Sequence, residues 1–412
     1  ATTYVTFVTA RIIGGIGIGG AILIAPIYIA EVAPPKLRGS LVSLNQLNIV
    51  IGISVAYFSN YFLKDIEIES WRWMLGVEAI PAFLYFLCLF IVPRSPRWLL
   101  QRWNDQESAH KILTKISGSD FADDTIEEIK RGAEKKEAKG TYSDFFSQRM
   151  KVIVIIAFGL AFFQQITGIN AIFYYAPTIF EQAGGSTDAS FLQAIVVGLT
   201  NLIFTFVAIY LIDRLGRKPL LLIGASAMAI SLSMATLAFN GATYTFDDQS
   251  LVKVDNEETR QALQDLNGST YYSQKEVFTN VAPLLTESQF TTFKQSGIKN
   301  FININASLVL IAILLYVAAF AISFGTVMWT MLSEIFPSNV KGLAISIVGF
   351  FNSLVSYTVT QFFPWELTNL GPTLTFAIYA MMAILSIVFV KRYVIETKGK
   401  SLEEVEELLI KS

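Results

Sequence analysis

Nine long apolar runs constrain the fold of this 412-residue chain more than any other feature of its sequence. The hydrocarbon core of a bilayer requires about 20 apolar residues per helix, and each run meets that length. Hydrophobic residues make up 53% of the chain and charged residues only 16%, a balance that is unusual for a soluble protein. The sequence predicts an all-α polytopic membrane protein, with spans near residues 4–30, 41–63, 72–92, 151–180, 191–212, 219–239, 302–330, 343–364 and 373–393.

The composition excludes several classes of function. A net charge of −2 gives no basic excess for a phosphate backbone, so we expect no nucleic-acid partner. The single cysteine, Cys88, excludes an internal disulfide and a multi-cysteine metal site, and the single histidine, His110, lies in a charged segment. Gly15, Gly17 and Gly20 match a dinucleotide-binding pattern, but they lie inside an apolar span with no strand before them. We therefore expect no cofactor and no metal.

Two polar segments separate the spans into groups. Residues 93–150 contain repeated helical patterns with charges of both signs, which predicts short surface helices. Residues 241–300 form an insert with eight acidic and five basic residues and no long apolar run. The sequence of this insert indicates no function.

Basic residues in the loops predict the orientation of the chain, because Lys and Arg near span ends remain in the cytoplasm. One side of the membrane receives residues 93–150 together with the basic residues of other loops and the tail, namely Lys36, Arg38, Arg214, Arg217, Lys218, Lys341, Lys391 and Arg392. The opposite side receives the acidic insert. We therefore expect a cytoplasmic C-terminus and place residue 1 outside, which is an unusual start for an intact protein.

An internal repeat accounts for this start. The segments AEVAPPKLRG at 30–39 and SEIFPSNVKG at 333–342 place an acid, a proline and a basic residue before glycine at the same spacing. Three spans and the loop DRLGRK at 213–218 precede the second copy in its half, and nothing corresponding precedes the first. The hypothesis is a molecule of twelve spans in two related halves, of which this chain lacks the first three. Chance similarity between two short loops is the alternative.

Five short strings turn this pattern into a resemblance. PRSPRWLL at 93–100, QQITGIN at 164–170, DRLGRKPL at 213–220, SEIFP at 333–337 and ETKGKSLEE at 396–404 have the order and spacing of the sugar porter family of the major facilitator superfamily. The chain most resembles bacterial proton-coupled xylose carriers and facilitative glucose carriers. The resemblance implies a major facilitator fold lacking its first three helices. Its parts would be three helices of the N-terminal bundle (1–92), a cytoplasmic linker (93–150), the six-helix C-terminal bundle (151–395) and a cytoplasmic tail (396–412).

The fourth span carries carboxamides, which suit the path of a neutral sugar because they donate and accept hydrogen bonds without attracting ions. Gln164, Gln165 and Asn170 interrupt an otherwise apolar run. On a straight helix Gln165 and Asn170 would point about 140° apart. Gly168 and Pro177 can break or bend the helix, and broken helices are common at transporter binding sites. The alternative is that these amides only join neighbouring helices.

The resemblance implies a set of sugar contacts spread over several helices. They are Gln46 from the fifth family helix, Gln164, Gln165, Asn170 and Tyr174 from the seventh, Asn201 from the eighth, Trp329 from the tenth and Asn352 from the eleventh. The indole of Trp329 is expected to stack on the apolar face of the sugar ring. Two positions depart from the family. Thr326 replaces a proline, which predicts a milder bend, and Ser353 replaces a second tryptophan, which leaves a smaller side chain in that wall.

Two ionisable residues lie well inside predicted spans, where a charge is costly and usually functional. Arg11 and Glu78 are therefore candidates for ion or proton coupling, and a purely structural ion pair is the alternative. In proton-coupled relatives an aspartate of the first family helix acts with the arginine that matches Arg11. That aspartate would lie before residue 1, so the sequence leaves open whether protons move with the sugar.

Charged residues at the predicted cytoplasmic ends of the spans form a different set. The resemblance implies a latch that holds the inner mouth shut, made of Glu31, Arg38, Arg97, Asp213, Arg217, Lys218, Glu334, Lys341 and Glu396. Arg94 stands where relatives have an acid, which removes one latch partner. Exposed pairs contribute little individually, so only a network could bias two conformations. The alternative is that these charges only set the topology.

The function predicted from these features is transport, not catalysis. We expect a multi-pass carrier of the inner or plasma membrane that moves a neutral hexose or pentose by alternating access and works as a monomer in the lipid bilayer. The first alternative is a sugar sensor built on the carrier fold, which would require a long cytoplasmic extension for signalling. The second alternative is a membrane enzyme, which would require a nucleophile with its base, or a group of metal ligands, within a span, and the sequence shows neither. An inactive fragment of a carrier is a further alternative.

Overall fold

The computed structural model describes residues 3–32, 35–66, 69–134, 141–254, 256–337 and 340–398. Within these ranges nine helical segments are long and apolar enough to cross a membrane, as the sequence predicted. Contacts between residues divide the chain into two compact units. Unit 1 holds Ala1–Gly52 and Leu63–Gly140, and unit 2 holds Ile53–Phe62 and Thr141–Ser412.

Unit 1 contains three long apolar segments followed by short helices. The apolar helices are α1 (Tyr4–Val32), α2 (Pro35–Leu63, of which Ile53–Phe62 belongs to unit 2), α3 (Ser70–Gly76) and α4 (Ala79–Leu89). The short helices are α5 (Pro96–Trp98), η1 (Leu99–Trp103), α6 (Gln106–Ser117) and α7 (Ser119–Glu134). The third predicted span is thus interrupted between Gly76 and Ala79. Pro81 lies in the first turn of α4, where its missing N–H leaves no helical bond unmade.

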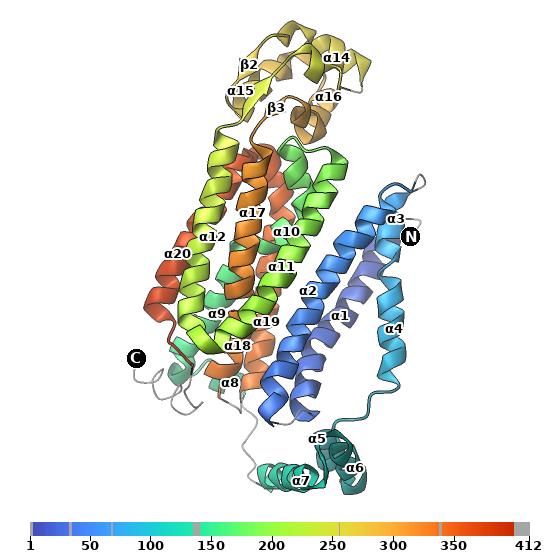
Figure 1. Ribbon diagram of the computed structural model, residues 1–412, viewed down its shortest axis with the longest axis vertical. Helices are drawn as coiled ribbons and strands as arrows, with labels where there is room; N and C mark the ends of the chain where they lie inside the picture. Colours follow the sequence, from blue (N-terminus) through green and yellow to red (C-terminus); the bar gives the residue numbers. More distant parts are fainter. Residues whose placement is uncertain are drawn as a thin grey trace. The chain divides into compact units, whose positions relative to one another are not determined.

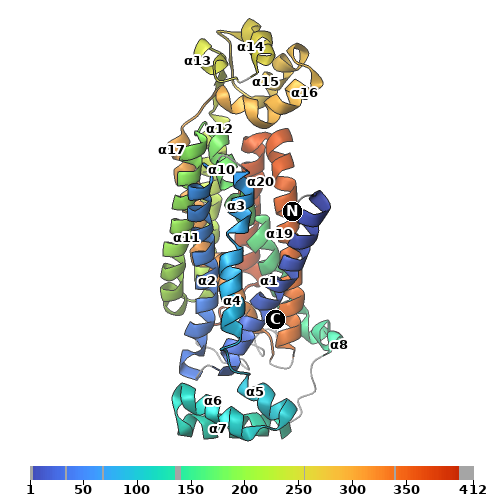
Figure 2. The ribbon, with the colours of Figure 1, turned by 90° about the vertical axis from the view of Figure 1, so that its right-hand side faces the viewer.

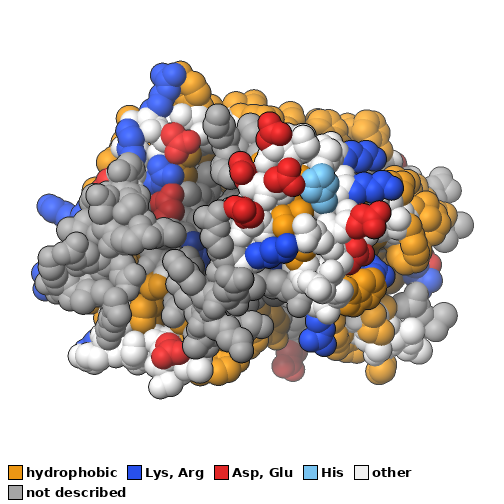
Figure 3. Space-filling view, turned by 90° about the horizontal axis from the view of Figure 1, so that it is seen from below, with side chains coloured by type: hydrophobic (Ala, Val, Ile, Leu, Met, Phe, Trp, Pro, Cys, Tyr) orange, Lys and Arg blue, Asp and Glu red, His pale blue; other side chains and the backbone are white. Residues whose placement is uncertain are grey.

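The helices after residue 93 are amphipathic surface helices, as predicted. Ser95 accepts a hydrogen bond from the backbone of Trp98 at the start of α5, and Asp105 caps α6 by accepting from Ser108. Their apolar sides form a small core of Leu99, Leu100, Ala109, Leu113, Ala122, Ile126 and Ile129. Their outer surface carries charges of both signs and the one histidine (Figure 3).

Unit 2 is a bundle of long helices around one continuous hydrophobic core. Its helices are α8 (Tyr142–Phe145), η2 (Gln148–Met150), α9 (Lys151–Ile166), α10 (Ile169–Gln182), α11 (Thr187–Leu215), α12 (Arg217–Asn240), α17 (Ala306–Phe320), η7 (Ala321–Gly325), α18 (Thr326–Ile335), α19 (Lys341–Asn369) and α20 (Gly371–Tyr393). Helix α12 packs along both α17 and α20 (Figures 1 and 2). A Cβ on Gly224 of α12 would lie 2.0 Å from Ser323 Oγ, so glycine permits this close helix crossing.

The insert between α12 and α17 folds into a small domain of its own. Its elements are β1 (Thr243–Thr245), α13 (Asp248–Leu251), α14 (Glu257–Leu263), η3 (Gln264–Leu266), β2 (Thr270–Tyr271), α15 (Gln274–Val281), η4 (Ala282–Leu284), α16 (Glu287–Thr292), η5 (Phe293–Gly297), η6 (Ile298–Asn300) and β3 (Ile302–Asn303). The strands form an antiparallel sheet in the order β2-β1-β3, with Tyr244 opposite Tyr271 on one side and Ile302 on the other. A separate core includes Phe246, which stacks on Phe301.

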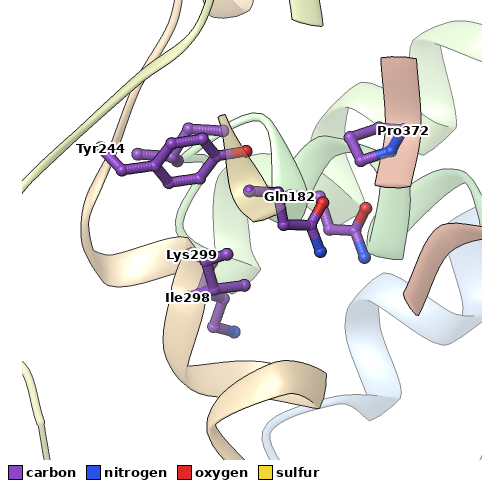
Figure 4. A pocket seen from close by; sticks show the side chains of 7 residues that line it. Gln182, Tyr244, Ile298, Lys299 and Pro372 are labelled. Atoms are coloured by element: carbon purple, nitrogen blue, oxygen red, sulfur yellow. The ribbon is translucent and has the colours of Figure 1, made fainter. Parts of the chain in front are cut away.

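The insert rests on the helix bundle of unit 2 through polar contacts. Lys299 Nζ lies 3.0 Å from Glu181 Oε2 at the end of α10. Next to this ion pair a small cavity is lined by residues of α10, α20 and the insert, namely Gln182, Tyr244, Gln274, Ile298, Lys299, Ile302 and Pro372 (Figure 4). We call this end of the bundle the insert end, and the opposite end, where α20 finishes, the tail end.

Candidate functional site

The fourth predicted span is not one helix but two. Helix α9 ends at Ile166 and α10 begins at Ile169, with Gly168 between them at φ +93°. A side chain would be strained at this φ, and a Cβ would also lie 3.1 Å from the ring of Tyr379. A second distortion follows at Tyr175, two residues before Pro177, where φ is −112° and ψ 17°. Both expected interruptions of this span are present.

The break brings together the carboxamides that a straight helix would separate. Asn170 Nδ2 donates to Gln165 Oε1 at 2.8 Å, and Gln165 Nε2 donates to Asn352 Oδ1 at 3.0 Å. Asn352 Nδ2 donates in turn to Gln164 Oε1 at 2.8 Å. We call Gln164, Gln165, Asn170 and Asn352 the amide cluster. It joins four of the residues that sequence reasoning selected, from α9, α10 and α19.

The amide cluster is also tied to the backbone of neighbouring helices. Gln164 Nε2 donates to the carbonyl of Phe324 at 2.9 Å, and Asn352 Nδ2 donates to that of Ala161 at 3.0 Å. Asn170 donates a second bond, of 2.7 Å, to Ser356 Oγ, a residue that sequence reasoning missed. Gln164, Gln165 and Asn352 are buried and Asn170 is half-buried. The amides therefore do join helices, which was the alternative interpretation, while Asn170 retains access to the surface of unit 2.

Two aromatic residues of the predicted set lie near this surface. Trp329 of α18 is 36% exposed, and its ring lies beside Gly349, one turn before Asn352 on α19. Tyr174 is exposed, one turn after Asn170 on α10. Before Trp329, the five residues Ala321–Gly325 form a π-helical turn, and Thr326 Oγ1 donates to the carbonyl of Ala321. The helix thus departs from α geometry immediately before Thr326, the residue that stands in place of the family's proline.

The two other predicted amide contacts come from α11 and α2. Asn201 is buried in α11, where its carbonyl accepts from Thr205, and among the described residues no hydrogen bond joins it to the cluster. Gln46 lies on α2 in unit 1, half-buried. Nothing in the sequence indicated that, among the described residues, Asn201 would form no hydrogen bond with the amide cluster, whereas Gln46 was already expected in the N-terminal bundle.

At the tail end of unit 2, four elements meet in a network of charges. Arg217 lies at the start of α12 and makes a two-bond contact with Glu334 of α18, with Nη2–Oε1 at 2.7 Å and Nε–Oε2 at 3.2 Å. Arg217 Nη1 also bonds Asp213 of α11 at 3.2 Å. Thr397, which sequence reasoning missed, donates to Glu334 Oε2 at 2.6 Å. Paired bonds from a planar guanidinium fix direction as well as distance.

Glu396 caps the first turn of α12 from the segment after α20. Its Oε1 accepts from the backbone N–H of Arg217 at 2.9 Å and its Oε2 from that of Lys218 at 3.0 Å. A carboxylate is favoured there because the first N–H groups of a helix have no internal partner. Although partial burial acts to raise the pKa of Glu396, the backbone N–H of Lys398 and those of Arg217 and Lys218, with the Arg217 charge, hold it below its usual value. Gly216, at φ +94°, leaves room for this carboxylate.

The remaining latch candidates are placed as follows. Lys218 Nζ bonds the carbonyl of Lys391, and Lys341 begins α19. Arg97 lies in α5 with an exposed side chain, and the guanidinium of Arg94 packs 4.2 Å from the ring centre of Trp103. The side chains of Glu31 and Arg38 lie outside the described residues.

Comparison with known proteins identifies the family. The family model described as sugar (and other) transporter matches residues 1–254 and 284–409. The D-xylose-proton symporter of Escherichia coli (strain K12) is 37% identical over 414 residues, covering 98% of this chain and 71% of the symporter. The arabinose-proton symporter of Bacillus subtilis (strain 168) is 35% identical, covering 98% and 75%. The chain belongs to the sugar transporter family.

A solved structure agrees with this assignment. The inward open conformation of the xylose transporter XylE from E. coli is similar to the chain with a TM-score of 0.69 and 34% identity, covering 98% of this chain and 72% of that one. The chain is therefore a major facilitator protein of the membrane-spanning sugar porters, and its long apolar helices are membrane helices. Residues 255–283, which include α14 and α15 of the insert, fall outside the match to the sugar transporter family model.

The coupling candidates of this sugar transporter meet in unit 1. Arg11 Nη1 lies 3.2 Å from Glu78 Oε2, so the two charged residues predicted inside spans form an ion pair. Both side chains are more than half exposed within the chain. A further acid lies in helix α19. Glu366, which sequence reasoning assigned to a loop, is part of α19 and accepts a 2.8 Å hydrogen bond from Tyr379 Oη.

Proposed function

We propose that this protein carries a neutral monosaccharide, a hexose or a pentose, across the membrane by alternating access. The observation that supports this most is the amide cluster, where four carboxamides from α9, α10 and α19 meet at a helix break. Carboxamides can exchange hydrogen bonds among themselves for bonds to sugar hydroxyls, and they bring no net charge that would attract ions. The relatives named above are a xylose and an arabinose symporter.

In this proposal Asn170 and Gln165 donate to and accept from the sugar, with Gln164 and Asn352 holding them in place. Trp329 offers the flat face on which a pyranose ring stacks, and the exposed Tyr174 flanks it. Gln46 and Asn201 are the remaining proposed contacts. Gln46 would contribute from the N-terminal bundle and Asn201 from α11.

The tail-end network is the proposed latch of the conformational cycle. Arg217 and Glu334 join α12 to α18, and Glu396 joins the tail to α12. Breaking such a set in one conformation and forming it in the other would bias the two states. We place this end and the C-terminus in the cytoplasm and the insert outside, because the basic loops gather at the tail end.

We further propose that protons move with the sugar, because the relatives named above are proton symporters. The Arg11–Glu78 pair is the proposed coupling element. A carboxylate held by an arginine within a membrane region can release the arginine when it binds a proton.

The test is uptake by the purified protein reconstituted into liposomes as a monomer. Labelled xylose, arabinose and glucose are offered with an imposed proton gradient, with the gradient dissipated by an uncoupler, and with a charged sugar acid as control. Accumulation of one neutral sugar that the uncoupler abolishes supports both proposals. Uptake that only equilibrates removes the proton coupling, and no saturable uptake of any neutral sugar overturns the carrier function.

A further inference from the structure

Two buried tyrosines from other helices, α17 and α20, contact the break between α9 and α10. Tyr316 of α17 donates from its hydroxyl to the carbonyl of Thr167 at 2.9 Å. A broken helix leaves carbonyls without partners, and in a membrane region only another protein group can satisfy them. Tyr379 of α20 lies with its ring against Gly168, the residue of positive φ. Neither tyrosine hydroxyl contacts the amide cluster.

The position of Tyr379 is fixed in turn by α19. Its hydroxyl donates to Glu366 Oε2 at 2.8 Å, and its ring stacks on Phe363 with centres 6.2 Å apart. The ring of Phe363 also lies beside that of Tyr175, at the second distortion of α10, with ring centres 5.4 Å apart. One turn of α19, from Phe363 to Glu366, therefore contacts Tyr175 directly and is linked to the break at Gly168 through Tyr379.

We propose that Tyr379, anchored by Glu366, is a positioning residue for sugar binding, while Tyr316 satisfies the carbonyl of Thr167 at the same break. This inference rests on the proposed function and deepens it. If the break relaxed, Gln165 and Asn170 would move apart, because only the break gives them their 2.8 Å contact. In this proposal Glu366 acts on sugar affinity through Tyr379 and the helix break.

The experiment uses four single variants of the full chain and the double variant Tyr379→Phe with Glu366→Leu. Tyr379→Phe removes the hydroxyl and keeps the ring, and Glu366→Leu removes the acceptor. Glu366→Gln keeps an acceptor oxygen, and Tyr393→Phe, on the same helix α20, is the matched control. Each is measured for binding of xylose and of glucose, for melting temperature, and for hydrogen exchange of the amides at 165–172 without sugar.

We expect Tyr379→Phe and Glu366→Leu each to weaken binding about threefold or more and to raise exchange at 165–172 by a similar factor. Glu366→Gln should keep sugar affinity and exchange at 165–172 close to the parental values. The double variant Tyr379→Phe with Glu366→Leu should lose no more affinity than either single variant, because the two groups form one hydrogen bond. The control should behave as the parent protein.

The outcomes separate this inference from the proposed function. Parental exchange at 165–172 in Tyr379→Phe and Glu366→Leu overturns the positioning role, whatever happens to transport. Raised exchange with parental sugar affinity also overturns it. If the parent protein itself binds neither xylose nor glucose and the variants still show raised exchange, Tyr379 supports the break, but its proposed role in sugar binding is overturned together with the proposed function.

Discussion

Asn170 and Gln165 share a 2.8 Å hydrogen bond although a continuous helix would turn them about 140° apart. The bond exists because Gly168 ends one helix and starts another at φ +93°. The break therefore brings Asn170 to Gln165, and the packing of α19 against α9 adds Asn352 to the same cluster. Sequence periodicity alone could not place them in contact.

Replacing Gly168 tests this dependence directly. Gly168→Ala should destabilise the protein by about 1–3 kcal/mol, because alanine is strained at this φ and its Cβ would meet the Tyr379 ring at 3.1 Å. Sugar binding should fall with it. Gly52→Ala, which has open space around its Cβ, is the control, and melting temperature and binding are the measurements. Parental values for Gly168→Ala would contradict the account of the break.

Removing the amide of Asn352, which links α19 to α9, should weaken sugar binding strongly because it also leaves its buried partners unsatisfied. Asn352→Ala leaves the buried amides of Gln164 and Gln165 each short of a partner, at about 1–3 kcal/mol. We expect sugar affinity to fall about tenfold or more. Asn369→Ala, an exposed amide on the same helix, should leave affinity unchanged. Titration calorimetry distinguishes the two.

Loss of the acid in the tail-end network should slow transport without abolishing sugar binding. Glu334→Ala leaves the guanidinium of Arg217 only 11% exposed and without its main partner. A change of about 1.4 kcal/mol between two conformations shifts their ratio about tenfold, so uptake should slow by that order. Arg97→Ala, at another predicted latch position, should also slow uptake. Glu257→Ala, in an exposed pair on the insert, is the control, and equal uptake by all four proteins at equal expression would remove the latch.

The cap made by Glu396 predicts a dependence on acid. Its pKa is lower in the folded protein than in the unfolded chain, so it stabilises the folded state fully above the ordinary value of about 4.5. That contribution is lost as the pH falls through the lowered pKa, when the protonated group no longer holds the N–H groups of Arg217 and Lys218. Protease sensitivity after residue 393 should therefore rise as the pH falls below the ordinary value of about 4.5 and through the lowered pKa. Glu396→Gln should show raised sensitivity already at pH 7 and little further change with acid.

The ion pair between the insert and α10 is expected to restrain the insert end of the bundle. Lys299→Met leaves Glu181 unpaired and should raise hydrogen exchange in the last turn of α10 and in η6. Lys294→Met, which removes a cation from Phe278 and Phe290 within the insert, is the matched control. If both variants exchange alike at the end of α10, the ion pair does not hold the insert in place.

The sequence alone determined the membrane class and the number of apolar spans, because a helix in lipid must be long and apolar wherever it lies. It also indicated the break, since Gly168 and Pro177 have local conformational effects that no partner needs to supply. The family resemblance selected the amides of the fourth span and Asn352, and these do meet. The spans and the break depend on a residue and its near neighbours in the chain, which is why the sequence could indicate them.

Contacts between distant segments needed the tertiary structure. Nothing in the sequence near Glu366 indicates that it lies inside a helix and holds Tyr379, and nothing near Thr397 indicates its bond to Glu334. Asn201 and Asn352 look alike as single amides in apolar spans, yet only Asn352 joins the cluster. The physical reason is that a hydrogen bond depends on distance and direction between side chains from separate helices. Those are set by how the helices pack, which hydrophobic length and periodicity do not specify.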